Sequence, residues 1–488
     1  MLPLSHVSTK WRRAALGDSS LWTTIYLNQT TAELFDMVLA RSGNRLFTVY
    51  VDHHDFNRFA KLWKLVDRIE ELHYSAGLRE LPRFLSFLGS APNLKILHLR
   101  PEFNIELEEL VPLMFLPTIF SGCLPSLRHL ALTYTIAWPD GLFRGLTSFE
   151  CGVLDHYPIS PPLVIDALRG SPSLEVLRLV GCGRLPRGFN PPVVALPSLG
   201  KCTLVGDGTT SLIRFITIPT TAVVLLSKSY ATSKSYANDS GSIFPNFRRH
   251  SVKPALRVLG EISAVSFSIN DQAVRLRARN DRGGDLDIVV DGLDNLPADP
   301  LNFVQFIQDS FACWRTCSGL ETTKDLTLSI ESGRILEPRD TTYDGLGLIE
   351  LVSILPDIEE AKFHGFPPQD LSLILRFLSC TPKMKLQCPN LKRLDVESAL
   401  LRSPGLLLAH IGELLEAREE VGVPLQSVAV KVKYEELNPV VDHRDLLSTW
   451  ESLVAGDVRL ELEQIEVERA AAEGEGGGVV DDSGRDYE

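Results

Sequence analysis

One phrase of apolar positions recurs along this chain. It places proline first, leucine two residues later, and apolar side chains again five and seven residues after the proline (P-x-L-x-x-L-x-L). The alternation at the end of each phrase predicts a strand whose leucines face a core while the residues between them face outward. Clear copies occupy residues 92–99, 124–132, 171–182, 196–207 and 388–396, and weaker ones residues 67–75, 145–152, 355–365 and 423–432.

Segments with helical periodicity lie between these strands. Helices are predicted within residues 78–92, 161–172, 369–380 and 406–417, and the first three end in Ser, Gly or Cys close to a proline, which cannot continue a helix. Helix and strand together form units of about 25 to 33 residues, too small to bury an apolar face alone. The pattern therefore predicts stacked units that share one parallel sheet.

The phrase resembles the leucine-rich repeat, and Cys182 stands at the Asn/Cys position of that signature. The resemblance implies an α/β fold: a solenoid with one parallel sheet, built from repeats over residues 28–225 and 321–465. Strands are expected at residues 96–100, 129–133, 176–180, 201–205 and 393–397. A single doubly wound α/β domain is the alternative.

Residues 226–320 interrupt the repeats. Residues 227–251 contain the tandem duplication SKSYAT-SKSYAN, which a surface loop tolerates better than a core, and a basic aromatic patch is the alternative reading. Residues 261–292 alternate apolar and polar side chains around an Arg-Gly-Gly-Asp turn, which predicts an antiparallel hairpin. Asp285, Asp287 and Asp291 are expected at strand ends and turns rather than around calcium, because Ile and Val occupy the positions between them.

The N-terminus carries a second pattern. Leu4, Val7, Trp11 and Ala14 or Ala15 recur at helical spacing, Gly17 ends that helix, and Asp18 is placed to cap a second one that contains Leu21 and Trp22. The order resembles the second half of an F-box in its common fungal version, L-S-x-V-C-x-x-W-R-x-x-A followed by L-W-x-x-I, with Ser8 in place of Cys. A helical hairpin that happens to contain two tryptophans is the alternative.

A full F-box begins with an earlier helix, so residues 1–27 are interpreted as a partial, N-terminally truncated F-box-like segment. Either the gene model is truncated or the adaptor interface has been weakened or lost. The resemblance implies a Skp1-like adaptor as partner and a role as the substrate-recognition subunit of a Skp1–cullin–F-box (SCF) ubiquitin ligase, with an unknown target protein. A non-catalytic repeat scaffold without Skp1 coupling is the alternative. The expected adaptor contacts are Leu4, Val7, Trp11, Leu21 and Trp22.

Composition narrows the functional classes. The 488 residues are 44% hydrophobic and 23% charged, as in a folded globular protein, and the formal net charge of −13 argues against nucleic acid as a partner. No apolar run approaches the roughly 20 residues that a membrane helix needs, and no secretory signal is recognised, so a cytoplasmic or nuclear location without a membrane partner is expected. Residues 466–488 are predicted to be a disordered acidic tail.

Motifs for catalysis are not found. The sequence has no nucleophile elbow, zinc-protease helix, phosphate-binding loop or dinucleotide fingerprint, and its eight cysteines include no C-x-x-C pair. The chain is therefore expected to be no enzyme and to hold no cofactor or metal, although an enzyme within the irregular middle stays a third hypothesis. Buried positions are expected for the cysteines.

A binding surface remains. In a leucine-rich array the outward strand residues line a concave face that commonly receives protein ligands. His73 and His98 hold the same place in consecutive repeats, and because neighbouring strands lie about 4.8 Å apart their rings are expected to be able to touch, which would make the surface sensitive to pH. The candidate binding residues are His73, His98, Arg100, His129, Arg178, Lys201, Arg393 and Asp395.

Overall fold

The computed structural model describes most of the two repeat regions and little of the segment between them. It forms two compact units, residues 1–361 with 387–391 and residues 362–386 with 392–488, and each is described by itself. The residues described are 8–27, 30–52, 64–75, 77, 81, 84, 89–100, 114–115, 119–122, 124–152, 158–183, 185–186, 188–229, 261–269, 273–291, 323–330, 357–366, 368–379, 387–401, 404–434 and 443–464.

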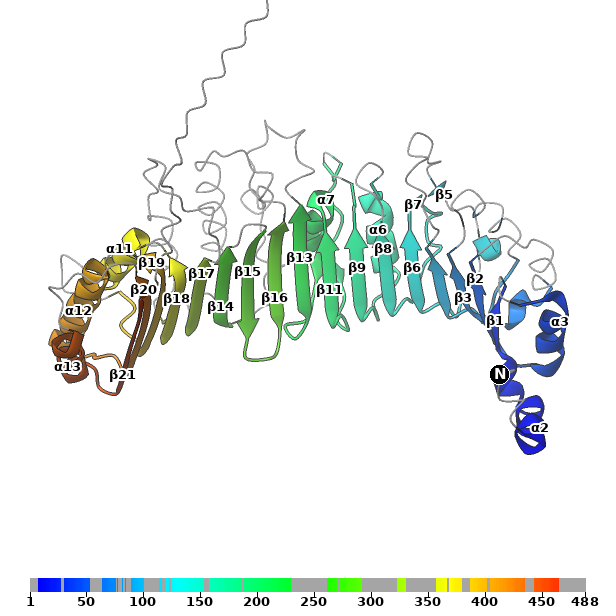
Figure 1. Ribbon diagram of the computed structural model, residues 1–488. Coiled ribbons are helices and arrows are strands. Elements are labelled where there is room, and N and C mark those ends of the chain that lie inside the picture. The colour runs from blue at the N-terminus through cyan, green and yellow to red at the C-terminus, as the bar shows by residue number, and fades with distance from the viewer. Residues whose placement is uncertain are drawn as a thin grey trace, which may run out of the picture. The chain divides into compact units, whose positions relative to one another are not determined.

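The first unit is built on one large, mostly parallel sheet (Figure 1). Its strands pair in the order β1-β2-β3-β4-β6-β8-β9-β11-β13-β16-β15-β14-β17. The strands are β1 (Thr24–Tyr26), β2 (Phe47–Val51), β3 (Ile69–Tyr74), β4 (Ile96–Leu99), β6 (His129–Thr133), β8 (Ser148–Gly152), β9 (Val176–Val180), β11 (Lys201–Val205), β13 (Val223–Ser229), β14 (Ile262–Ile269), β15 (Ala273–Asn280), β16 (Asp285–Asp291) and β17 (Asp325–Ile330).

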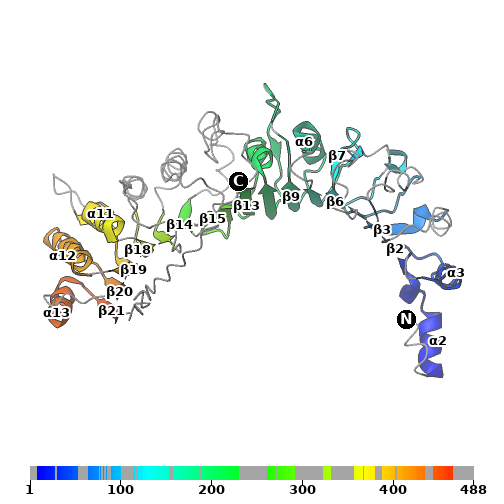
Figure 2. The same ribbon diagram turned by 45° about the horizontal axis from the view of Figure 1, so that its top comes forward.

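Short helices and two small strand pairs complete the first unit. The pairs β5–β7 and β10–β12 are both parallel. Figure 2 shows α6 and α7 on the same face of the sheet. The elements are α2 (Thr9–Gly17), α3 (Ala32–Arg41), α6 (Pro161–Arg169), α7 (Asp207–Thr210), the 3₁₀ helices Ser19–Trp22, Val66–Arg68, Ile119–Gly122 and Ser211–Phe215, and the strands β5 (Met114–Phe115), β7 (Thr135–Ala137), β10 (Val194–Ala195) and β12 (Ile216–Thr217).

A tight turn containing proline precedes the strand in each clear copy of the repeated phrase. The leucine amide donates to the carbonyl three residues earlier, with proline directly after that carbonyl: Leu174 N bonds Ser171 O at 3.1 Å, and Leu199 N bonds Leu196 O at 3.1 Å. The same bond closes at Leu94, Leu127 and Leu391. Proline favours the second position of such a turn because its fixed φ is already the required one. The phrase is therefore a turn followed by a strand.

The turn delivers the following leucines to the core in register. Leu97, Leu130, Phe149, Leu177 and Cys202 are aligned across five neighbouring parallel strands, and all are at most 1% exposed. A second column two residues further on contains Leu99, Leu132, Cys151, Leu179 and Leu204 and is equally buried. Burial of two apolar side chains per strand supplies the main stabilisation of the stack.

Helix α6 shows how the segments between strands cover the core. It begins at Pro161 and buries Val164, Ile165, Ala167 and Leu168, so its apolar stripe packs inward while its other side stays wet. Gly170 follows its last residue, and Ser171 then opens the next turn. The helix expected within residues 161–172 is therefore confirmed, whereas most of the helix expected within residues 78–92 lies outside the described residues.

The hairpin expected within residues 261–292 is present and belongs to the main sheet. β15 and β16 are antiparallel, β14 and β15 are also antiparallel, and the outer strands of this triplet pair in parallel with β13 and β17. In the turn between β15 and β16, Asn280 Oδ1 accepts from the amides of Arg282 (3.0 Å) and Gly284 (2.8 Å). Gly283 has φ +85°, and a Cβ on Gly284 would lie 2.1 Å from a backbone oxygen, so this turn requires both glycines.

The N-terminal segment has the predicted cap at Asp18, which accepts from Ser20 N (2.9 Å) at the start of the 3₁₀ helix. A second cap was not predicted: Ser8 is extended and accepts from Trp11 N (3.2 Å), so α2 begins at Thr9, after Leu4 and Val7, and not with them as the helical spacing predicts. Trp22 is 3% exposed and its Nε1 donates to Ala15 O at 2.6 Å, which ties the two helices together. Ala15 is the buried residue of α2.

The second unit repeats the alternation of strand and helix. Its strands β19, β20 and β21 are parallel neighbours, and the chain enters this unit within β18. Leu394 and Val396 of β19 align with Val428 and Val430 of β20, and all four are buried. The elements are β18 (Glu360–Phe366), α11 (Pro368–Ser379), β19 (Arg393–Leu401), α12 (Gly405–Glu420), β20 (Ser427–Tyr434), α13 (His443–Leu453) and β21 (Asp457–Gln464).

The predicted α/β class with a large, mostly parallel sheet is thus confirmed. The strands expected from residue 96 to residue 205 fall within a residue of their predicted bounds. Cys151, Cys182, Cys202 and Cys388 are buried, as expected, and form no disulfide among the described residues. The predicted loop at residues 227–251 lies almost wholly outside the described residues, and the predicted acidic tail at residues 466–488 lies outside them entirely.

Replacement of Leu177 by alanine is expected to lower the free energy of unfolding by roughly 2–5 kcal/mol, because the side chain is fully buried in the first leucine column. Urea denaturation measures the loss. Val176→Ala, one residue earlier on the half-buried outer face, is the matched control and is expected to cost less. A loss under about 1 kcal/mol for Leu177→Ala would contradict the leucine core.

Candidate binding surface

The strand residues between the leucines form the face opposite α6 and α7, here called the open face (Figure 2). It is the face of the first unit's sheet that carries Tyr26, Tyr50, His73, His98 and Glu150, aligned with one another strand by strand. Because the strands are parallel, equivalent positions of successive strands become direct neighbours on this face.

An aromatic row crosses the first four strands of the open face. The rings of Tyr26 and Tyr50 are stacked at 4.7 Å with an interplanar angle of 9°, and those of Tyr50 and His73 at 4.5 Å and 10°. His98 meets His73 edge-on, with ring centroids 4.7 Å apart at 82°. The contact expected between the two histidines is therefore present, and two tyrosines that the sequence reasoning missed extend it.

The two histidines are joined through their ring nitrogens. His73 Nδ1 lies 3.0 Å from His98 Nδ1, and His73 Nε2 lies 3.5 Å from Glu71 Oε2. A hydrogen bond between two Nδ1 atoms needs one donor and one acceptor, so at least one imidazole must keep a lone pair there. The contact is consequently incompatible with double protonation of both rings.

His98 sits in surroundings that oppose its charged form. Burial, followed by the nearby His73, Arg100 and His129, lowers the pKa of His98 to about 4, and only Glu71 acts in the opposite direction. Burial also raises the pKa of Tyr50, with smaller contributions from Tyr26 and Glu71. The imidazole of His98 is therefore uncharged at neutral pH.

An ion pair bridges over the next strand. Arg100, which follows β4, places its Nη2 3.0 Å from Glu150 Oε2 on β8, and β6 lies between these strands. Ala131, the outward position of β6 between His98 and Glu150, is 3% exposed. His129 at the start of β6 is exposed, as expected.

Arg178 and Lys201 lie further along the open face. Both side chains are exposed, on the neighbouring strands β9 and β11. Register pairs Lys201 with Val176 and Thr203 with Arg178, so the two cations are diagonal neighbours. The structure thus gathers six of the eight candidate residues on one sheet face, in a histidine group and a basic group.

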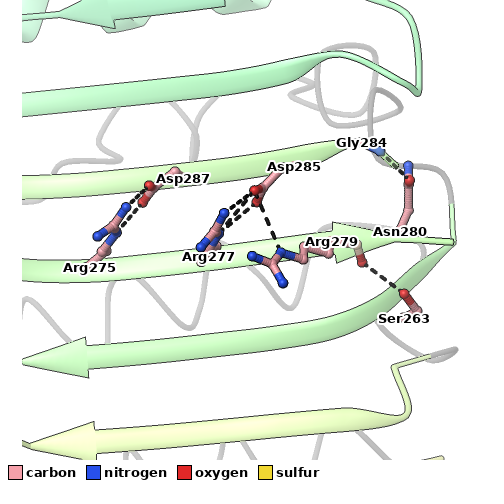
Figure 3. A network of polar contacts seen from close by, with 8 residues as sticks. All are labelled: Ser263, Arg275, Arg277, Arg279, Asn280, Gly284, Asp285 and Asp287. Carbon is pink, nitrogen blue, oxygen red and sulfur yellow. Dashed lines mark hydrogen bonds and ion pairs between the residues drawn. The ribbon is translucent and has the colours of Figure 1, made fainter. Parts of the chain in front are cut away.

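An arginine–aspartate network closes the far part of the open face (Figure 3). Arg275 Nε donates to Asp287 Oδ1 at 2.8 Å, Arg277 Nε lies 3.1 Å from both oxygens of Asp285, and Arg279 Nε lies 3.7 Å from Asp285 Oδ2. The hydrogen bond from Arg277 lowers the pKa of Asp285. Asp285 and Asp291 are the two ends of β16, as expected, whereas Asp287 stands inside the strand, which corrects that expectation for Asp287 alone.

The remaining candidates, Arg393 and Asp395, lie on β19 of the second unit. Arg393 is exposed and Asp395 half-buried. A polar group of that unit was not anticipated: Glu397 Oε2 lies 3.1 Å from His364 Nδ1, and Glu397 Oε1 lies 3.8 Å from Lys431 Nζ. The hydrogen bond from His364 lowers the pKa of Glu397, with a further contribution from Lys431.

The N-terminal candidates divide into exposed and buried residues. Trp11 is 57% exposed and Leu16 on the same helix 37%, whereas Trp22 is buried. Leu21 is half-buried, and Leu4 and Val7 lie outside the described residues. Helix α2 therefore presents a large aromatic side chain to solvent that the described remainder of the unit leaves uncovered.

Neither a metal centre nor a membrane segment is found among the described residues. No group of three or more His, Cys, Asp and Glu side chains there could hold a metal ion. No helix in those ranges has both the length and the apolar character to cross a bilayer. Burial raises the pKa of Cys182 and Cys202 to about 12, so neither thiol is poised as a nucleophile.

Comparison with known proteins adds no assignment. No protein-family model matches the sequence, and no curated protein matches it.

Acidification is expected to destabilise the fold through His98. Its folded pKa of about 4 lies below the unfolded value of 6.5, so between these pH values the unfolded state binds more protons and stability falls as pH falls. Discounted for solvent screening, the effect is on the order of 2 kcal/mol from pH 7 to pH 4.

Unfolding free energies of the parent chain and His98→Asn, measured by urea denaturation across this pH range, isolate the contribution. The parent chain is expected to lose stability relative to the variant as pH falls. A difference between the two that does not change with pH would show that His98 is not held in its neutral form.

Proposed function

We propose that this chain is a leucine-rich-repeat receptor that binds a target protein on its open face. We propose further that it docks on a Skp1-like adaptor through its F-box-like N-terminus, as the substrate-recognition subunit of an SCF-type ubiquitin ligase. The observation that carries the first part is the recurrence of one turn-and-strand unit, whose leucines are buried while its polar positions line a sheet face that the described helices leave uncovered.

The geometry favours binding over catalysis. The open face consists of side chains fixed on regular strands, stacked or ion-paired with neighbours, as suits a broad contact with another protein. Its polar groups form a continuous row rather than converging on one point where a reacting atom would sit. Such a surface recognises a partner by the order of aromatic, basic and acidic groups along it.

The adaptor part of the proposal is supported by Trp11. Burial of tryptophan in a partner is a frequent source of binding energy, and an exposed tryptophan on a capped helix is otherwise an unfavourable surface residue. Trp22 holds the adjoining turn through its bond to Ala15 O, so α2 has a defined attachment. Together they give a helix that is anchored at one end and presents Trp11 and Leu16 to solvent beside the exposed Lys10, Arg12 and Arg13.

A non-catalytic scaffold without adaptor coupling is the second candidate. It is favoured by the separation of the two features: the open face begins on β1, and none of its described ion pairs or ring stacks involves α2. Target binding and adaptor binding are consequently independent properties, and either can be present without the other.

Replacement of Trp11 by alanine is expected to weaken adaptor binding at least tenfold without lowering the melting temperature, because an exposed side chain contributes to the interface and little to the fold. The measurement is co-purification of the full chain with a Skp1-like adaptor, followed by titration. Leu406→Ala is the matched control, because Leu406 on α12 is 62% exposed and outside the F-box-like segment.

Two results would contradict the ligase assignment. One is absence of co-purification with the adaptor and a cullin. The other is equal binding by the parent chain and Trp11→Ala. Either would leave the scaffold as the function, since the open face does not depend on α2.

A further inference from the structure

A basic group and a set of valines share the middle of the open face. Lys201 and its register partner Val176 lie beside Arg178 on the two central strands, and Val223 on β13, the register partner of Lys201 on its other side, is 44% exposed. The remaining members are half-buried valines on the same strands. The basic–valine patch consists of Val176, Arg178, Val180, Lys201, Val205 and Val223.

The carboxylate nearest to the patch on one side is already engaged. Glu150 on β8 is the direct register partner of Arg178 on β9. Its Oε2 nevertheless lies 3.0 Å from Arg100 Nη2, across β6 in the opposite direction. Glu150 therefore stands where a carboxylate would most readily neutralise Arg178, but its side chain is bound to Arg100.

The carboxylates on the other side are engaged as well. Asp285 on β16 is the register partner of Val223 at the edge of the patch, and Asp287 follows on the same strand face. Both are bound from β15 by Arg275, Arg277 and Arg279, on the side away from the patch (Figure 3). Three arginines for two aspartates leave no negative charge there to turn toward Lys201.

Arg178 and Lys201 consequently differ from cations at comparable places in the sheet. Lys95, directly before β4, pairs with Glu70 at 2.6 Å, and Lys324, directly before β17, pairs with Glu359 at 3.6 Å. Across the ranges that the structure describes, no carboxylate pairs with Arg178 or Lys201. This positive spot, with half-buried valines and the exposed Val223, lies in a chain of net charge −13.

We infer that the basic–valine patch receives an acidic segment of the target protein, one in which Asp or Glu side chains accompany apolar ones. The inference rests on the proposed function only in that the open face receives a protein. Carboxylates of the segment bind Arg178 and Lys201, and no described ion pair within the chain has to break for this. The apolar side chains of the segment cover Val176, Val205 and Val223. The neutralised networks on both sides limit the attraction to the patch.

A synthetic peptide in which glutamates alternate with leucines is the probe, with the glutamine-for-glutamate peptide as its control. Binding to the full chain is followed by fluorescence anisotropy at low and at physiological salt. The double variant Arg178→Gln, Lys201→Gln is expected to weaken binding of the acidic probe roughly threefold to thirtyfold. The glutamine peptide is expected to bind the parent chain no more tightly than it binds the double variant.

Variants that each remove one charge separate a local effect from a change in net charge. Arg178→Gln alone and Lys201→Gln alone are each expected to weaken probe binding more than Lys95→Gln. The last variant also removes one exposed cation, at a distance of several strands, and is expected to change probe binding less than twofold. Glu150→Gln releases Arg100 beside the patch and is expected to tighten binding, whereas Glu70→Gln, which releases Lys95, is not.

Three outcomes would overturn the inference. In the first, the double variant and Lys95→Gln behave alike. In the second, a peptide of residues 468–488 binds the patch as tightly as the probe, which would assign the patch to the chain's own acidic terminus. In the third, sedimentation shows self-association that the double variant abolishes. Adaptor co-purification of the double variant, measured in parallel, is expected to be unchanged, so failure of this inference is distinct from failure of the ligase assignment.

Discussion

The hydrogen bond that closes each proline-containing turn is the constraint on which the rest of the sheet depends. It fixes the residue at which a strand begins, and the backbone then gives every following side chain a definite face. A shift of one residue would move Leu177 and Leu179 to water and bring Arg178 into the core. The amide after the turn also bonds to the preceding strand, as Glu175 N does to Thr147 O at 2.8 Å, so each turn sets the register of its neighbour.

Parallel register has a second consequence, on the polar side. Equivalent positions of consecutive strands become neighbours less than 5 Å apart, so residues that are alike stack into rows. Tyr26, Tyr50 and His73 form such a row, and His98 ends it. Stacked aromatic rings gain from this proximity, whereas like charges lose by it. The pKa of His98 is lowered first by its burial in this row and then by the neighbouring His73, Arg100 and His129.

The sequence allows the local parts of this architecture to be predicted, and not the contacts that span strands. Turn, strand and buried leucine follow from one short phrase, and the β15–β16 hairpin follows from its alternation and its glycines. The stacking of Tyr26 and Tyr50 was not predicted because β1 and β2 lack the proline phrase. The ion pair of Arg100 was not predicted because Glu150 lies two strands away, and the length of the intervening loops decides which side chains meet. For the same reason, pairing of β14 with β17 and of β16 with β13 could not be read from periodicity.

Internal pairing, rather than the number of charges, decides where the open face can attract a partner. Exposed ion pairs contribute little to stability, about 0–1 kcal/mol each. They nonetheless determine which charges remain for a ligand, because a carboxylate held by one arginine is not offered to another. Glu150 binds Arg100, which lies two strands away, and does not bind its register partner Arg178. Asp285 and Asp287 bind the arginines of β15. Among the residues that the structure describes, no carboxylate compensates Arg178 or Lys201, because the neighbouring carboxylates bind other arginines. A change in either network therefore alters the charge of the patch without replacing a residue in it.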